Sequence, residues 1–132
     1  MTVKKITPVL FVEEVEPCVA FWVDRLGFGK TAEVPEGDKL GFAMLQRGNV
    51  ELMYQSYASA DKDSAASAYA ARKGPTFLYA EVDDLNDIIR AIKGAEVVMP
   101  VRETFYGAKE ISVKDPGGHI VTFAQFQATA QH

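Results

Sequence analysis

Two stretches of the chain repeat the same pattern of hydrophobic and polar positions. The first runs from an apolar segment at residues 6–12, through acidic residues, into apolar side chains spaced three or four apart. The second does the same from residues 76–82. Val12 and Val82 take equivalent places, and 82 − 12 = 70 residues is about half of the 132. Each stretch predicts a buried strand followed by an amphipathic helix, so we expect two copies of one module.

The first copy contains clear stop and start signals. Pro17 is tolerated only in the first turn of a helix, which predicts a helix start at Val15 or Glu16. Gly27 is placed to end that helix. Turn residues at 35–38 and 48–49 separate three further predicted strands, at residues 27–34, 40–46 and 50–56.

The second copy follows a bridge rich in Ala, Ser and Asp at residues 58–72, of which 65–71 can form a short helix. Asp84 is a predicted N-cap, and Gly94 is expected to stop the helix. Further strands are expected at residues 95–99, 108–113 and 119–125, with a turn at 115–118 and a frayed tail from Gln127. We therefore predict an α+β fold of two tandem βαβββ modules, at about residues 4–57 and 75–126, joined by a bridge at 58–74, within one domain.

Side-chain alternation along the strands predicts two chemically different sheet faces. The face expected to pack on the helices is almost purely apolar: Leu10, Val12, Leu52, Leu78, Val82, Val121 and Phe123. The opposite face is expected to line a cleft: Thr7, Val9, Phe11, Glu51, Met53, Gln55, Phe77, Tyr79, Glu81, Thr122 and Ala124. In the strand at 108–113, Glu110 and Ser112 are left to the cleft, because Ile111 and Val113 take the apolar side.

Composition narrows the class of protein. The content of 48% hydrophobic and 24% charged residues is that of a soluble globular protein. A net charge of −4 with scattered basic residues argues against nucleic acid. No apolar run approaches the roughly 20 residues of a membrane span, and no signal segment is visible. With Cys18 as the single cysteine, we expect a cytoplasmic protein without a disulfide.

Two motifs carry a family resemblance: Phe21-Trp22 with Leu26-Gly27-Phe28, and Asp115-Pro116-Gly117-Gly118-His119. Together with two βαβββ modules they resemble the vicinal oxygen chelate superfamily, which includes glyoxalase I, extradiol dioxygenases, and fosfomycin- and bleomycin-resistance proteins. The resemblance implies that each module curls into half of an open barrel, with helices outside. The stretch at 106–116 is most similar to the bleomycin-resistance branch, which implies a homodimer with clefts shared between subunits.

The same resemblance permits a test for a metal site. Metal-using members place ligands on the first and last strands of each module, which correspond here to Thr7, Glu51, Phe77 and Thr122. Of these only Glu51 is a strong donor for a divalent metal. Alternation turns His119 away from Thr122, so we expect a turn-flanking or core-edge histidine, and Cys18 is expected to serve packing. We predict no metal and no other cofactor.

The predicted cleft is aromatic and apolar with up to three carboxylates, Glu51, Glu81 and Glu110, as small-molecule sites often are. We therefore expect a metal-independent binding protein of the bleomycin-resistance type, which sequesters a cationic or aromatic antibiotic-like ligand. The candidate ligand-binding residues are Phe11, Glu51, Met53, Phe77, Tyr79, Tyr106, Glu110 and Thr122.

Several alternatives stay open at this point. The aromatic residues of the cleft can simply be core, and Tyr106 an exposed turn residue. The carboxylates of Glu51 and Glu110 can pair internally, with Lys109, Arg102 or Arg47. The chain can instead be an enzyme, namely a glyoxalase-like lyase, dioxygenase or transferase with relocated metal ligands or a carboxylate base. It can also be a partner-binding module whose cleft is packed. The sequence names no catalytic residue and no ligand, and does not show whether modules swap between chains.

Overall fold

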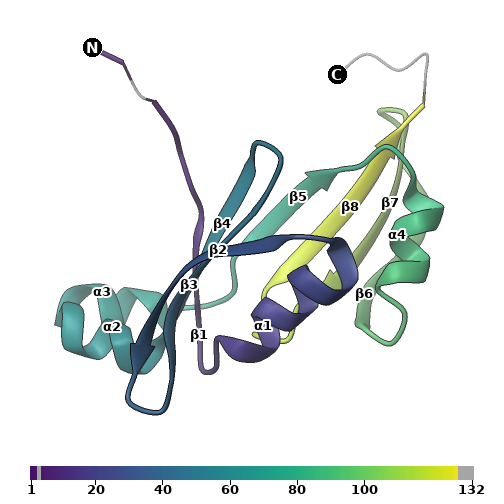
Figure 1. The fold of residues 1–132 in the computed structure, drawn as a ribbon. Coiled ribbons are helices and arrows are strands. Elements are labelled where there is room, and N and C mark those ends of the chain that lie inside the picture. The colour runs from purple at the N-terminus through teal and green to yellow at the C-terminus, as the bar shows by residue number, and fades with distance from the viewer. Residues whose placement is uncertain (3, 128–132) are drawn as a thin grey trace. The chain divides into compact units, whose positions relative to one another are not determined.

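The computed structural model describes residues 1–2 and 4–127, apart from the side chain of residue 67 (Figure 1). The chain divides into two compact units, Met1–Gly74 and Pro75–His132. Each unit is built around its own four-stranded mixed sheet. The tail beyond Gln127, including His132, lies outside the described residues.

The first unit contains a parallel strand pair and an antiparallel meander. Its elements are β1 (Val9–Val12), α1 (Glu16–Ala20), the π-helix η1 (Phe21–Arg25), β2 (Gly29–Glu36), β3 (Lys39–Arg47), β4 (Val50–Ser56), α2 (Tyr57–Asp63) and α3 (Ala65–Ala71). The sheet order is β1-β4-β3-β2, with β1 parallel to β4 and the other pairs antiparallel. Helix α1 packs against β3, and α2 packs against α3.

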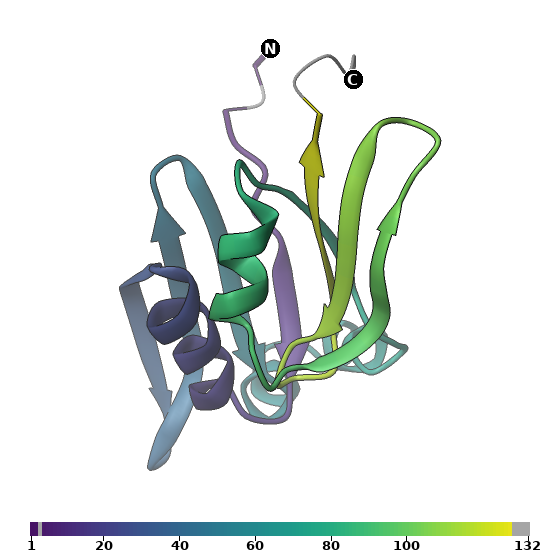
Figure 2. The same ribbon diagram turned by 90° about the vertical axis from the view of Figure 1, so that its right-hand side faces the viewer.

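The second unit repeats this topology (Figure 2). Its elements are β5 (Phe77–Glu81), α4 (Leu85–Ala91), β6 (Glu96–Glu103), β7 (Ala108–Lys114) and β8 (Ile120–Phe126). The sheet order β5-β8-β7-β6 is that of the first sheet, again with its first pair parallel. The predicted α+β fold of two βαβββ modules is therefore confirmed.

The helix boundaries follow the predicted chemistry. Pro17 lies in the first turn of α1, and the Asp84 carboxylate accepts a hydrogen bond from the Asp87 backbone amide at 3.2 Å as the N-cap of α4. Gly27 and Gly94 follow the helices with φ of 74° and 94°, which L-residues with a side chain adopt at a cost. The π-helical turn of η1 was not predicted.

The core of the first unit is organised around Trp22 on η1. Its indole Nε1 donates a 2.8 Å hydrogen bond to the hydroxyl of Tyr54, and both side chains are buried. The rings of Phe21 and Phe28 pack edge-on against the indole. Cys18 is fully buried in the same unit, in agreement with the predicted packing role.

The elements differ most from the prediction in three places. The first strand begins at Val9 rather than at residue 6. The bridge contains a second helix, α2, which Ser56 caps by accepting from the Ser59 amide. Strand β6 continues to Glu103 instead of ending at residue 99, because its end pairs with β7 beyond two irregularities of register near Pro100.

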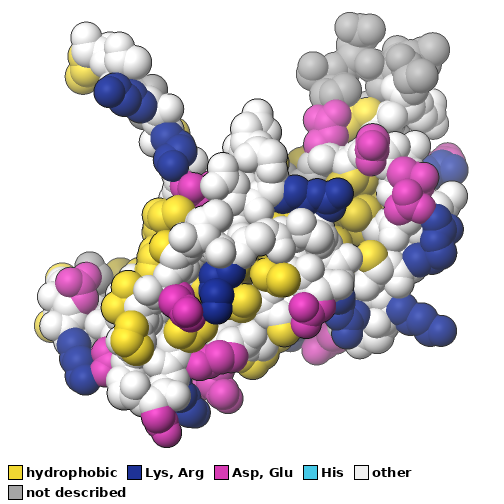
Figure 3. All heavy atoms as spheres, viewed as in Figure 1, with side chains coloured by type: hydrophobic (Ala, Val, Ile, Leu, Met, Phe, Trp, Pro, Cys, Tyr) yellow, Lys and Arg dark blue, Asp and Glu magenta, His cyan; other side chains and the backbone are white. Residues whose placement is uncertain are grey.

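The predicted face alternation is clearest in β4. Leu52 and Tyr54 are buried, whereas Glu51, Met53 and Gln55 on the other face are half-buried. On the molecular face in Figure 3, basic and acidic side chains are interspersed, as the scattered charge predicted. No helix in the described part of the chain is long and apolar enough to span a bilayer.

Candidate functional site

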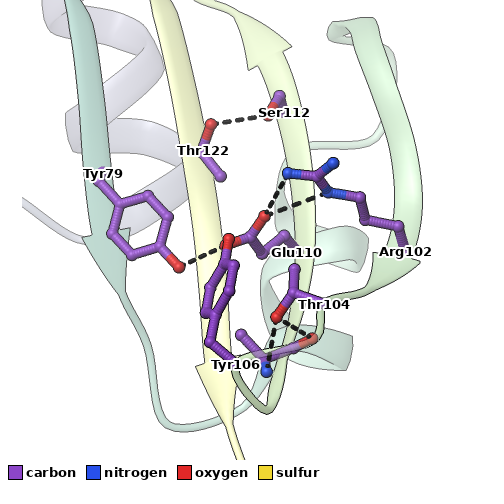
Figure 4. A network of polar contacts seen from close by, with 8 residues as sticks. Tyr79, Arg102, Thr104, Tyr106, Glu110, Ser112 and Thr122 are labelled. Atoms are coloured by element: carbon purple, nitrogen blue, oxygen red, sulfur yellow. Dashed lines mark hydrogen bonds and ion pairs between the residues drawn. The ribbon is translucent and has the colours of Figure 1, made fainter. Parts of the chain in front are cut away.

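A buried carboxylate lies at the centre of the candidate site, on β7 of the second unit. Only 1% of the Glu110 side chain is exposed. Its Oε2 accepts hydrogen bonds from the hydroxyls of Tyr79 and Tyr106, the latter at 2.5 Å (Figure 4). Its Oε1 accepts from Nε and Nη2 of Arg102, at 3.3 and 3.2 Å. Three side chains from three parts of the chain therefore converge on one carboxylate.

The strand register explains how these residues meet. Arg102 on β6 is the direct neighbour of Glu110 on β7. Tyr79 comes from β5, two strands away, and its side chain extends across β8 to reach Glu110. The β8 residue opposite Glu110 is Ala124.

A tight turn between β6 and β7 positions Tyr106. The hydroxyl of Thr104 accepts from the Ala108 amide at 3.0 Å, and the Gly107 amide donates to the Thr104 carbonyl at 3.2 Å. Gly107 has φ of 88°, which favours glycine. The ring of the neighbouring Phe105 lies edge-on to Tyr106 at 5.1 Å. The turn thus holds the Tyr106 hydroxyl against Glu110.

Burial and hydrogen bonding oppose each other at Glu110. Burial alone would raise the pKa of its carboxyl, but hydrogen bonds from Tyr106, Tyr79 and Arg102 outweigh burial and lower that pKa below its ordinary value of 4.5. Desolvation of the phenol and its bond to Glu110 raise the pKa of Tyr79. The site therefore holds a carboxylate and a neutral phenol at neutral pH.

Two hydroxyls continue the polar face of this sheet. Ser112 on β7 and Thr122 on β8 are register neighbours, and their side-chain oxygens lie 2.7 Å apart. Thr122 is also the register neighbour of Tyr79 on β5. The predicted assignment of Glu110 and Ser112 to the same face is therefore confirmed.

Strand β5 forms the exposed side of the site. Phe77, Tyr79 and Glu81 alternate along one face of this strand, and we refer to them as the β5 strip. Phe77 is 73% exposed and Tyr79 is 54% exposed. Within the second unit these two residues are therefore exposed rather than packed in its core. Glu81 is exposed, as expected for the end of the strand.

The other candidate residues belong to the first unit. Glu51 on β4 accepts a 3.0 Å hydrogen bond from the Thr7 hydroxyl and pairs with Lys5 at 2.8 Å. The hydrogen bonds from Lys5 and Thr7 lower the pKa of Glu51. Phe11 on β1 and Met53 on β4 are half-buried, and the register of the two strands places them on the same face of the first sheet.

The structure thus brings together Tyr79, Tyr106, Glu110 and Thr122 within the second unit, with Phe77 on the same strand as Tyr79. The internal pairing of Glu110 with Arg102, which was the alternative to ligand contact, is present. Arg47 instead donates to the Leu26 carbonyl at 2.6 Å, and Lys109 pairs with Glu103 at 4.0 Å. Lys5 was missed as a partner, because no periodic pattern links it to Glu51.

The positions equivalent to metal ligands do not fit a divalent metal. The Thr7 and Thr122 hydroxyls are engaged with Glu51 and Ser112, and Phe77 has no donor atom. Within residues 1–2 and 4–127, no three His, Cys, Asp or Glu side chains cluster as a metal site would require. His119 is buried, and its Nδ1 accepts from the Thr76 amide at 2.7 Å, in agreement with the predicted turn-flanking role.

Comparison with known proteins agrees with the family resemblance of the sequence motifs. A sequence model described as Glyoxalase/Bleomycin resistance protein/Dioxygenase superfamily matches residues 4–123. No curated protein matches the sequence.

Three solved structures illustrate the range of similar folds. A glyoxalase/bleomycin resistance protein/dioxygenase from Nocardioides is 18% identical, with a TM-score of 0.74 over 99% of this chain and 89% of that one. The bleomycin-binding protein from bleomycin-producing Streptomyces verticillus, complexed with copper(II)-bleomycin, is 28% identical, with a TM-score of 0.62 over 96% and 100%. A lactoylglutathione lyase from Agrobacterium tumefaciens is 14% identical, with a TM-score of 0.73 over 95% and 96%. The Nocardioides protein and the lyase show a shared fold alone.

Proposed function

The chain belongs to the glyoxalase/bleomycin resistance protein/dioxygenase superfamily, and we propose that within it the protein is a metal-independent binding protein that sequesters a cationic or aromatic small molecule. The observation that carries this proposal is the β5 strip. Two aromatic side chains are exposed there, and one of them, Tyr79, is anchored through its hydroxyl to the buried Glu110. Flat apolar surface next to a few fixed polar groups is typical of small-molecule sites.

The state of the carboxylates favours binding over catalysis. A general base at neutral pH works best with a raised pKa and an accessible oxygen. The pKa values of Glu51 and Glu110 are lowered, and each carboxylate is already engaged by neighbouring donors. A carboxylate-base enzyme is therefore the less favoured alternative.

The bleomycin-binding protein of Streptomyces verticillus supports the proposal of a cationic or aromatic ligand. It is 28% identical over nearly the full length of both chains, and its structure contains copper(II)-bleomycin. By analogy, sequestration of such a molecule would give the host resistance to it. We further propose a cytoplasmic homodimer, which light scattering tests as a mass of about twice 14.5 kDa.

Calorimetric titration tests the binding proposal. We expect bleomycin or a cationic aromatic dye such as ethidium to bind with a Kd below about 1 mM. Tyr79→Ala removes the anchored ring, and we expect it to weaken binding by at least about fivefold. The matched control is Tyr69→Ala, which removes an exposed tyrosine from α3 in the first unit. Failure of both compounds to bind, or equal effects of the two substitutions, would contradict the proposal.

A further inference from the structure

We propose that Glu110 is a positioning residue that acts through Tyr79, and that it makes the site prefer flat aromatic cations over neutral aromatic molecules of the same shape. This inference rests on the proposed binding function and adds the property that selects the ligand. It assigns Glu110 a role other than direct ligand contact.

Glu110 is poorly placed to touch a ligand itself. Its side chain is 1% exposed, and both of its oxygens accept hydrogen bonds from Tyr79, Tyr106 and Arg102. A ligand group that displaced these donors would leave buried polar groups unpaired, at a cost comparable to what it gained. The Glu110 carboxylate therefore affects a ligand through the side chains that donate hydrogen bonds to it.

Tyr79 is the side chain through which that action reaches the surface. Its hydroxyl is tied to Glu110, yet 54% of the residue's surface is exposed. Donation of the phenolic hydrogen to an anion polarises the O–H bond and pushes electron density into the ring. A more electron-rich ring face attracts a cation more strongly.

The charged side chains near Tyr79 do not oppose the binding of a cation at its ring. Arg102 would repel a cation, but its guanidinium is held on Glu110 and its charge is offset there. Glu81 lies two residues from Tyr79 on the same face of β5 and adds a negative charge. A test must therefore distinguish the contribution of the Tyr79 ring to the preference for a cation from the contribution of the Glu81 charge.

A matched pair of probes provides this test. N-methylquinolinium is a permanent cation, whereas 4-methylquinoline has the same size and is neutral at about pH 8. We expect the protein to bind the cation about fivefold more tightly, the upper end of the effect of one exposed cation–π contact. Tyr79→Phe keeps the ring and removes the hydroxyl, and we expect it to retain affinity for 4-methylquinoline while the preference falls below about twofold.

Three further variants test whether the hydrogen bond between Tyr79 and Glu110 is the origin of the preference for the cation. Glu110→Gln should lower the preference as Tyr79→Phe does, provided that circular dichroism shows a folded protein. Glu81→Gln should keep most of the preference, and Asp61→Asn, on α2 of the first unit, should keep all of it. Loss of the preference in Glu81→Gln with its retention in Tyr79→Phe would overturn the proposal.

The two proposals fail in different ways. If the protein binds neither probe nor any other aromatic cation, the binding function itself is wrong. If it binds both probes equally, the binding function stands and the role of Glu110 is wrong.

Discussion

At the scale of single residues, the protonation state of Glu110 affects the stability of the second unit. Its pKa is lowered in the folded protein, so the folded state favours the charged carboxylate more than the unfolded state does. The resulting stabilisation is fully present above the unfolded pKa, near 4.5, and is lost as the pH falls through the lower folded pKa. Acid should therefore weaken this network.

Glu110→Gln tests this linkage. We expect the substitution to lower the free energy of unfolding at pH 7 by about 1–3 kcal/mol, because donors to a buried carboxylate lose a charged acceptor. The difference between the two proteins should shrink as the pH falls from about 4.5, where the unfolded carboxyl begins to take up protons, through the lower pKa of the folded wild-type protein. Urea unfolding at several pH values measures it, and a difference that is constant from pH 7 to pH 3 would refute the assignment.

The buried hydrogen bond between Trp22 and Tyr54 is a second residue-scale contact with a measurable consequence. Tyr54→Phe leaves the indole N–H without this acceptor, and we expect a loss of about 1–3 kcal/mol in unfolding free energy. Tyr69→Phe is the control, because it removes a hydroxyl that bonds Lys73 at the surface and should change stability by less than about 0.5 kcal/mol. Equal losses in the two variants would show that the Trp22 bond is not a net stabiliser.

At the scale of elements, the N-cap of α4 is the clearest link from sequence to stability. Asp84→Ala removes the carboxylate that accepts from the Asp87 amide, and we expect a loss of about 0.5–2 kcal/mol. Asp83→Ala removes an adjacent exposed carboxylate that is not the cap, so it should have less effect. Thermal and urea unfolding compare the two variants, and an equal or larger effect at Asp83 would contradict the cap assignment.

Elements with strong local signals were predictable. Pro17, Asp84 and the turn at 115–118 act on backbone within a few residues of themselves, so α1, α4 and the β7–β8 hairpin were found from sequence. Alternation correctly placed Glu51 and Met53 on one face of β4, because one face of the strand is buried. The extension of β6 was missed, because it depends on pairing with β7 rather than on its own residues.

At the scale of the molecule, the same topology occurs twice but carries two different polar arrangements. In the first unit Glu51 is paired by Lys5 and Thr7, and in the second Glu110 is held by two tyrosines and Arg102. Sequence reasoning expected Glu51 and Glu110 to need partners, because charged residues in mid-strand near a core are rarely left unpaired, and both have them. It did not find that Tyr79 reaches Glu110, because 31 residues separate them and their contact depends on strand order.

The comparison of the two units also yields a prediction about metals. The positions that would carry ligands, Thr7 and Glu51 in one unit and Phe77 and Thr122 in the other, supply a single carboxylate, which Lys5 and Thr7 already engage. We therefore expect protein dialysed against EDTA to bind N-methylquinolinium with unchanged affinity, because no residue of the proposed site depends on a metal. Elemental analysis of protein purified without chelator should show well under one metal ion per chain. Stoichiometric zinc, nickel, manganese or iron, together with loss of binding after chelation, would instead favour the lyase or dioxygenase alternative.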